Sequence, residues 1–124
     1  MEPDDERRLT AAELEIMRVL WDRGESTVHD VADTLGGDRA YTTLSTLVRI
    51  LEQKGFVQSR KDGRRHLYSA VTEKRSYEQS TVRDLVRRLF DRPASVVRSL
   101  LESGAIDERE LEEIRQLIDR KDKP

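Results

Sequence analysis

The stretch AYTTLSTLVRILEQKGFVQSRKDGRRHLY, residues 40–68, decides the fold of this chain, because its periodicity changes partway through. Leucine and valine first recur at helical spacing, and Gly55 ends that helix as a left-handed cap. Two extended runs follow, residues 56–60 and 64–68, which flank Lys61-Asp62-Gly63. The Asp62-Gly63 step between them favours a tight turn since both residue types tolerate positive φ. The stretch therefore predicts a helix followed directly by a β-hairpin.

Two further helices are predicted upstream of this stretch. Thr10 and Glu13 form a capping box at the start of the first helix, and Thr27 and Asp30 repeat the pattern at the second. A glycine ends each of these helices. Three short helices followed by a hairpin are the element order of a winged helix-turn-helix domain, which we assign to residues 9–71.

Residues 72–124 read as three more helices with narrow apolar stripes. So short a segment cannot cover all the stripes by itself, and a two-fold partner offering the same surface would bury them. We therefore predict a mainly α fold with a small β-hairpin wing, a flexible segment over residues 1–8, and a three-helix dimerisation tail. The expected dimer contacts beyond Tyr77 are Leu85, Leu89, Val97, Leu100, Leu101, Leu111, Ile114, Leu117 and Ile118.

Composition limits the function classes. Leu, Ile, Val and Phe make up a quarter of the 124 residues, which exceeds the level of about 20% below which chains tend to stay unfolded. The chain has no cysteine, which excludes disulfides and thiolate metal sites, and no apolar run of membrane-spanning length. We expect a soluble cytoplasmic protein without membrane insertion.

Charge is unevenly distributed along the chain. The net charge is only −2, but residues 38–66 hold seven Lys or Arg and three acids, a net charge of +4, while residues 1–37 carry −6. The positive segment coincides with the third helix and the hairpin, as phosphate binding requires. The predicted DNA-binding residues are Arg39, Tyr41, Thr42, Thr43, Ser45, Thr46, Arg49, Lys61, Arg64, Arg65 and His66.

Other functions have less support in the sequence. His29 and His66 have no nearby ligand set for a metal ion, and Ser69 near His66 has no orienting acid. We expect no catalytic site, metal or cofactor, and we interpret Trp21 and Tyr68 as core residues. The alternative to a DNA-binding repressor is a dimeric winged-helix adaptor that binds proteins without specific DNA binding.

Several motifs together resemble one family. They are LTAAELEIMRVLW at residues 9–21, TV-x-DV at 27–31, the run from AYTTL to GFV at 40–57, and GRRHLY at 63–68. With its helical tail, the chain resembles the penicillinase-repressor family, which includes the β-lactamase, methicillin-resistance and copper-responsive repressors. The resemblance extends over residues 9–121.

The resemblance implies a homodimer on a dyad-symmetric operator, double-stranded DNA as the partner, and relief of repression through a membrane sensor metallopeptidase that responds to an antibiotic. The chain departs from the family pattern at three places. Ile50 replaces a family arginine, with Arg49 one position earlier, about 100° away around the helix. Ser99-Leu100 stands near the cleavage pair Asn-Phe of the best-known members, and the cysteine-rich tail of copper-responsive members is missing.

Overall fold

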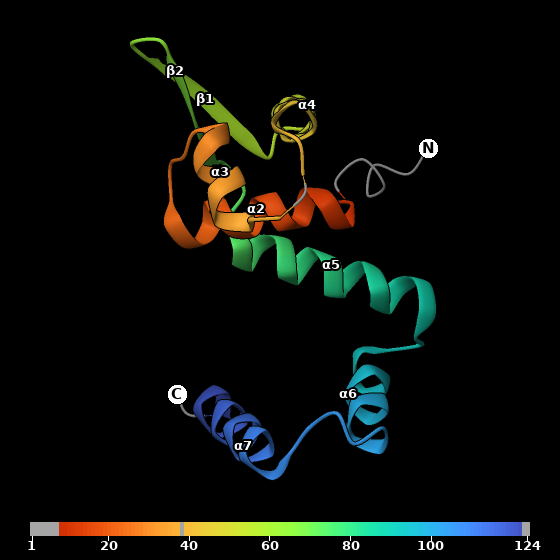
Figure 1. Cartoon of the computed structure of the whole chain (residues 1–124). Helices are drawn as coiled ribbons and strands as arrows, with labels where there is room; N and C mark the ends of the chain where they lie inside the picture. Colours follow the sequence, from red (N-terminus) through yellow and green to blue (C-terminus); the bar gives the residue numbers. More distant parts are fainter. Residues whose placement is uncertain (1–7, 38, 123–124) are drawn as a thin grey trace. The chain divides into compact units, whose positions relative to one another are not determined.

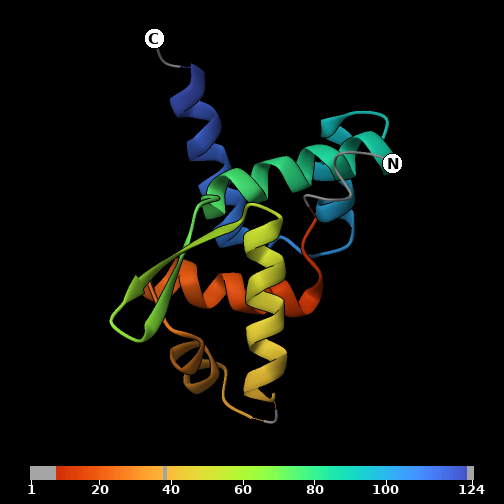
Figure 2. The same ribbon diagram turned by 90° about the horizontal axis from the view of Figure 1, so that it is seen from above.

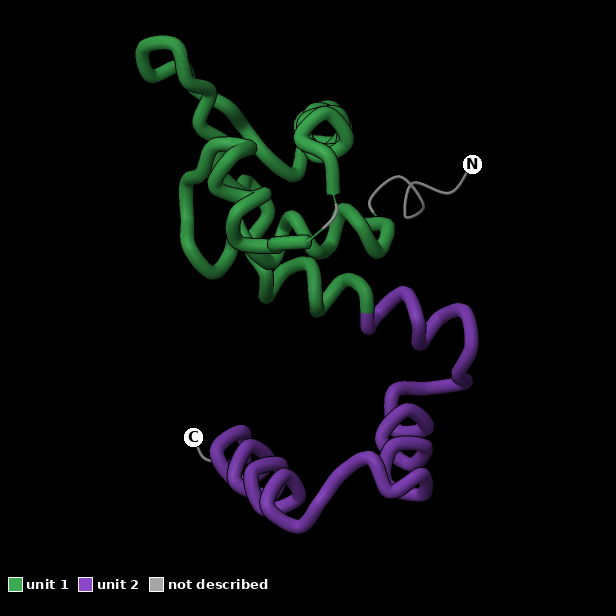
Figure 3. The backbone as a smooth tube through the Cα atoms, in the orientation of Figure 1, with its two compact units in different colours: residues 1–81 green, residues 82–124 purple. Residues whose placement is uncertain are grey.

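The computed structural model describes residues 8–37 and 39–122, so the predicted flexible segment 1–8 lies almost entirely outside the described residues. The described part contains six helices and a two-stranded antiparallel hairpin (Figure 1). In chain order they are α2 (Ala11–Arg23), α3 (Val28–Leu35), α4 (Tyr41–Gln53), β1 (Val57–Asp62), β2 (Arg65–Ala70), α5 (Lys74–Leu89), α6 (Pro93–Glu102) and α7 (Glu108–Asp122). The chain forms two compact units, unit 1 (residues 1–81) and unit 2 (residues 82–124), coloured green and purple in Figure 3.

Helices α2 and α3 begin at the two predicted capping boxes. The Glu13 N–H donates to Thr10 Oγ1 at 3.2 Å, and the Thr10 N–H donates to the Glu13 carboxylate at 2.8 Å. Thr27 and Asp30 exchange the same two bonds, both at 3.0 Å. Each box satisfies two backbone N–H groups that would otherwise lack partners at a helix start. Both predicted helix starts are therefore confirmed.

The core of unit 1 lies where α2, α3 and α4 pack together, and Figure 2 shows α4 crossing α2. Leu47 on α4 is only half-buried. Burying a large aliphatic side chain contributes roughly 1.5–3 kcal/mol to stability. The packing of α4 against α2 and α3 therefore fixes which face of α4 is exposed. The fully buried apolar residues of the unit 1 core are Ile16, Met17, Val31, Leu44, Val48 and Leu51.

The hairpin turn differs from the prediction by one residue. Asp62 pairs with Arg65 in the strand register, so the turn consists of Gly63 and Arg64 rather than Asp62 and Gly63. Gly63 has φ 64°, and within the described ranges every residue with positive φ is a glycine. A two-residue turn with glycine first matches the twist of the strands, and it leaves Asp62 free to stay in β1.

The base of the hairpin is joined to the loop between α2 and α3. Ser26 and Tyr68 exchange two backbone hydrogen bonds of 2.9 and 2.8 Å, which adds one residue of a third strand to the sheet. The tip of the hairpin projects past the helices of the same unit (Figure 1). The wing is thus anchored at its base and open at its tip.

Helix α5 begins inside unit 1 and not in a separate tail. The Leu9 N–H donates to Tyr77 Oη at 2.9 Å, and the Tyr77 ring lies 6.1 Å from the Trp21 ring and 5.9 Å from the Phe56 ring, between centroids. Tyr77, which the sequence placed in the dimer stripe, therefore packs on the winged-helix core of its own chain. The unit boundary also falls after Thr81 and not after Val71.

Unit 2 contains the end of α5 with α6 and α7. Pro93 opens α6, and Asp107 Oδ1 accepts the Glu110 N–H at 2.8 Å at the start of α7. Asp84 is the one buried residue that α5 contributes, and α6 and α7 contribute none over their described lengths. None of the helices in the described ranges is long and apolar enough to cross a bilayer.

Candidate nucleic-acid interface

The outward face of α4 carries hydroxyl side chains. Tyr41, Thr42, Thr43 and Thr46 are exposed and Ser45 is half-buried, whereas the opposite face of the helix forms the core. The Thr46 hydroxyl donates to the Thr42 carbonyl oxygen at 2.9 Å, which keeps the side chain close to the helix. A helix with such short side chains can approach base edges closely in a major groove.

A groove of about 520 Å³ lies between the start of α3, the face of α4 and the hairpin. We call it the reading groove. Six of the predicted DNA-binding residues line it, namely Tyr41, Ser45, Arg49, Arg64, Arg65 and His66. The other five lie outside its lining, namely Arg39, Thr42, Thr43, Thr46 and Lys61.

The reading groove also includes residues that the sequence did not predict, of which His29 is the most informative. The His29 and Tyr41 rings lie 4.4 Å apart between centroids, with their planes tilted by 31°. The contact joins α3 to the first residue of α4, and both side chains are exposed. Its only signal in the sequence was a histidine near a helix start, which does not indicate a contact with another helix.

Ion pairs sort the cations of this surface into two groups. Arg39 pairs with Glu15 on α2 at 2.9 Å, and Arg60 binds Glu25 through two nitrogens at 2.8 and 2.7 Å. The hydrogen bond from Arg65 to Asp62, 2.8 Å long, lowers the pKa of that carboxyl group. These cations already have an acidic partner, so a phosphate group would have to compete for them.

Arg49, Lys61 and Arg64 form the second group. Within the described residues no acid lies within ion-pair distance of these three side chains, all of which are exposed. Arg49 belongs to α4, and the other two belong to the hairpin. They are the cations most available to phosphate groups, because binding would not require breaking an existing pair.

An ion pair between Lys54 and the buried Glu13 carboxylate holds the end of α4 against α2. Lys54 Nζ lies 2.9 Å from both carboxylate oxygens of Glu13, whose side chain is 2% exposed. Burial alone would raise the pKa of Glu13, but the Thr10 N–H and the Lys54 ammonium group outweigh that effect and hold the pKa below its ordinary value. Glu13 therefore caps α2 and positions α4 with one carboxylate.

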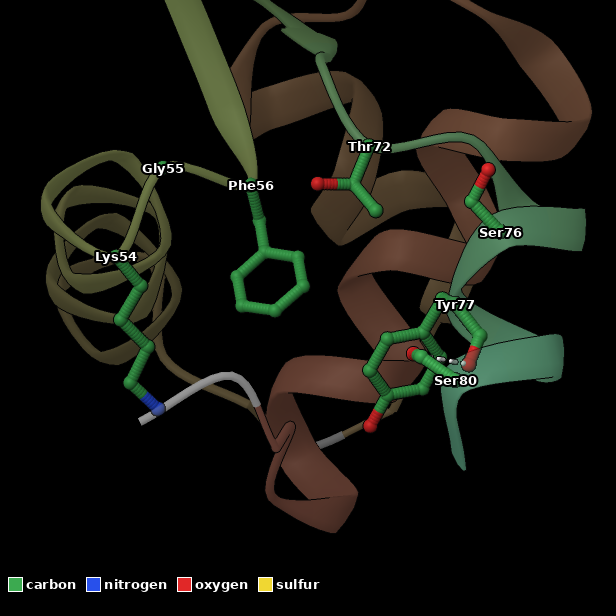
Figure 4. Close-up of a pocket in the computed structure, with 7 residues that line it drawn as sticks. All are labelled: Lys54, Gly55, Phe56, Thr72, Ser76, Tyr77 and Ser80. Atoms are coloured by element: carbon green, nitrogen blue, oxygen red, sulfur yellow. Dashed lines mark hydrogen bonds between the residues drawn. The ribbon is translucent and has the colours of Figure 1, made fainter. Parts of the chain in front are cut away.

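A second cavity, of about 390 Å³, lies between the end of α4 and the start of α5 (Figure 4). Figure 4 shows the Phe56 side chain coming from the segment between α4 and β1 and the Tyr77 side chain coming from α5. Three polar side chains that line the cavity are bonded within the protein: Lys54 to Glu13, the Tyr77 hydroxyl to the Leu9 backbone, and the Ser80 hydroxyl to the Tyr77 carbonyl at 3.0 Å. The cavity is a packing junction around α5.

The predicted dimerisation residues of unit 2 are mostly exposed. Leu111 and Ile114 are half-buried, and Leu89 is 71% exposed. The remaining ones are between 43% and 58% exposed, namely Leu85, Val97, Leu100, Leu101, Leu117 and Ile118. The stripes predicted from the sequence are thus present on the surface of this unit.

The chemistry of the reading groove suits an anion. Its lining offers arginines, imidazoles and hydroxyl groups. In the part of the chain that the structure describes, no three His, Asp or Glu side chains are grouped to hold a metal ion. Paired carboxylates for general acid and base catalysis do not occur in the lining of this groove either.

Comparisons with known proteins agree with this geometry. The family model of the penicillinase repressor matches residues 9–120. The chain is 24% identical over 115 residues to the penicillinase repressor of Bacillus licheniformis, across 90% of both proteins. It is 22% identical over 116 residues to the methicillin resistance regulatory protein MecI of Mammaliicoccus sciuri, across 91% of this chain and 94% of MecI.

Solved structures show the same fold. A homodimeric winged helix-turn-helix DNA-binding domain of Mycobacterium bovis is 25% identical, with a TM-score of 0.50 over 67% of this chain and 76% of that one. MepR, a transcription regulator of a Staphylococcus aureus multidrug efflux pump, is 19% identical, with a TM-score of 0.51 over 94% of this chain and 80% of MepR. The chain therefore belongs to the penicillinase repressor family and is a winged-helix repressor, not an enzyme.

Proposed function

We propose that two copies of this chain bind one dyad-symmetric DNA operator, with α4 of each copy in the major groove and the hairpin on the adjacent backbone. The observation that carries the proposal is the exposed hydroxyl face of α4 beside Arg49, Lys61 and Arg64, the cations without an ion-pair partner in the described residues. One surface thus offers base contacts from short side chains and phosphate contacts from the cations.

The exposed apolar side chains of unit 2 support a homodimer. Leucine, isoleucine and valine side chains lie at the surface of all three of its helices. A second copy with the same surface would bury them through a two-fold interface. Two tethered reading helices would then bind as a bivalent unit, which increases affinity without any new contact.

Relief of repression by an upstream signal is part of the same proposal. The relatives are named for penicillinase and for methicillin resistance, and the family resemblance implies a membrane sensor metallopeptidase as a partner of this cytoplasmic repressor. Ser99 and Leu100 lie within α6, where the family resemblance places an Asn-Phe cleavage pair. A cut at this bond is not part of the proposal, because the residues differ.

A gel-shift experiment with the DNA upstream of the protein's own gene tests the proposal. We expect a retarded complex at nanomolar protein that unlabelled upstream DNA removes and random DNA does not. Equal competition by both DNAs would contradict sequence-specific binding. Absence of a complex at low salt would favour the adaptor function, which requires no DNA contact.

A further inference from the structure

We propose that the reading groove holds a stretch of the DNA phosphodiester backbone, and that His29 and His66 bind it as imidazolium ions, so that DNA binding strengthens at acid pH. The inference rests on the proposed function, namely that the chain binds DNA. It goes beyond that function by extending the DNA-contacting surface onto α3 and by predicting uptake of protons on binding.

The first support is the location of the histidines. The chain has two histidines, one on α3 and one on β2, and both line the same groove. Arg49, Arg64 and Arg65 line it with them, and its lining contains no carboxylate. A groove with this lining attracts an anion, and the face of α4 that forms one of its walls is the face proposed to enter the major groove.

The second support is the contact between His29 and Tyr41. The two rings lie 4.4 Å apart, and Tyr41 is the first residue of α4. An exposed imidazole that packs on a ring in this way loses less conformational freedom on binding a phosphate than a free side chain does. The contact also connects a ligand bound by His29 to the start of α4.

The charged and titratable groups around the two imidazoles are four cations, two acids and two tyrosines. Asp30 on α3 is already engaged, because it accepts the Thr27 N–H and pairs with Arg23 at 3.6 Å. Asp33 follows His29 by one helical turn. Lys61 is opposite His66 in the strand register. The remaining groups that line the groove are Tyr41, Arg49, Arg64, Arg65 and Tyr68.

Proton uptake follows from elementary electrostatics. Histidine is the side chain whose charge changes between pH 5 and 8, and a neighbouring phosphate group favours the charged form. If DNA favours the protonated form of two imidazoles, then acid pH favours DNA binding by the same linkage. Because phosphate contacts do not read sequence, the effect is expected with any duplex.

Fluorescence anisotropy with a labelled random-sequence duplex of about 30 base pairs measures this directly. The full-length protein is titrated at pH 6 and at pH 8 at one ionic strength. We expect about tenfold or tighter binding at pH 6, and a change below roughly twofold in the His29→Gln/His66→Gln double variant. Each single variant is expected to lose part of the effect.

The outcomes separate this inference from the proposed function. If no duplex binds at either pH, then the proposed function fails as well. If the duplex binds equally at both pH values, or if the double variant keeps the pH dependence, only the present inference is overturned. Loss of the whole effect in His66→Gln alone would remove His29 from the site. Thermal melting of each variant at both pH values establishes that the proteins compared are folded.

Discussion

Unit 1 buries its large apolar side chains, whereas unit 2 leaves most of its own at the surface. In unit 1, Ile16, Met17 and Leu44 are 0% exposed, while in unit 2 Leu89 and Leu117 are 71% and 58% exposed. The sequence periodicity is helical in both units, so the difference lies in what the helices pack against. Unit 1 completes its core within one chain, and unit 2 presents surfaces that a second copy would complete.

Removal of unit 2 is expected to lower operator affinity more than any other change. A chain of residues 1–81 keeps Tyr77 and should be folded and monomeric, and its affinity for the operator should fall by at least about 100-fold, because bivalent binding is lost. Sedimentation and gel shift measure the two properties. As a control, a chain of residues 1–71 should also have a lower Tm, because it loses Tyr77. Operator affinity equal to that of the full chain would contradict the role of unit 2.

Substitutions of apolar residues in the two units are expected to have different effects on thermal unfolding. Leu51→Ala in the core of unit 1 should lower the free energy of unfolding by about 2–5 kcal/mol, because it leaves a cavity. Leu117→Asp with Ile118→Asp in unit 2 should instead abolish the dependence of Tm on protein concentration, since it removes dimer contacts. Thermal melting over a hundredfold range of concentration separates the two effects. A concentration-dependent Tm in the double variant would show that these residues are not in the interface.

Base reading is predicted to reside on the exposed face of α4. Thr43→Ala or Thr46→Ala should weaken operator binding by about 1–3 kcal/mol and relax base preference, with the Tm unchanged. Thr46→Ser keeps the hydroxyl and Thr46→Val keeps a methyl, so this matched pair shows which group contacts the base. Binding competition between the operator and single-base variants measures the preference. Wild-type affinity and preference in both alanine variants would exclude α4 as the reader.

The ion pair between Glu13 and Lys54 is predicted to stabilise unit 1 in a pH-dependent way. Glu13→Gln keeps an acceptor for the Thr10 N–H but loses the charge, which should cost about 1–2 kcal/mol at pH 7. The folded pKa of Glu13 is lowered, so its contribution is complete above the ordinary pKa of 4.5 and is lost as pH falls through the folded value. Urea unfolding at pH 7 and at about pH 3.5 measures the difference. An equal cost at both pH values would rule out a charge effect.

The smallest expected effect is the difference in salt dependence of DNA binding between substitutions of the neighbouring Arg64 and Arg65. Arg64 has no acid within ion-pair distance in the described residues, whereas Arg65 pairs with Asp62. Arg64→Ala should therefore reduce the slope of log affinity against log salt by up to about 0.9, and Arg65→Ala by less. Both changes should affect specific and random DNA alike, because phosphate contacts carry no sequence information. A larger change of slope in Arg65→Ala would reverse the assignment.

Local signals made much of unit 1 predictable. The Thr10/Glu13 and Thr27/Asp30 boxes specify helix starts through residues three apart, and the change of period after Gly55 indicates the hairpin. The turn was displaced by one residue because Asp62 and Gly63 both tolerate positive φ, and the strand register decides between them. Hydrogen bonds between residues that are close in the sequence can thus be predicted from the sequence alone.

Contacts between distant segments were not predictable in this way. Tyr77 reads as one more apolar residue of a helical tail, whereas its bond to the Leu9 backbone, 68 residues away, and its contacts with the Trp21 and Phe56 rings show that it belongs to unit 1. Likewise, the sequence gives the charge of Arg39 but not its pairing with Glu15 on another helix. His29 was missed for the same reason, since its partner Tyr41 follows on the next helix.

Hydroxyl-radical footprinting of the operator, with the protein-to-DNA ratio determined by sedimentation, tests whether two copies of the chain bind one operator. We expect two protomers per duplex and two protected half-sites, separated by about one helical turn of DNA or a small multiple of it. The chain of residues 1–81 should protect neither half-site at the same concentration. One protomer on a single protected site, or protection by the truncated chain equal to that of the full chain, would contradict the account.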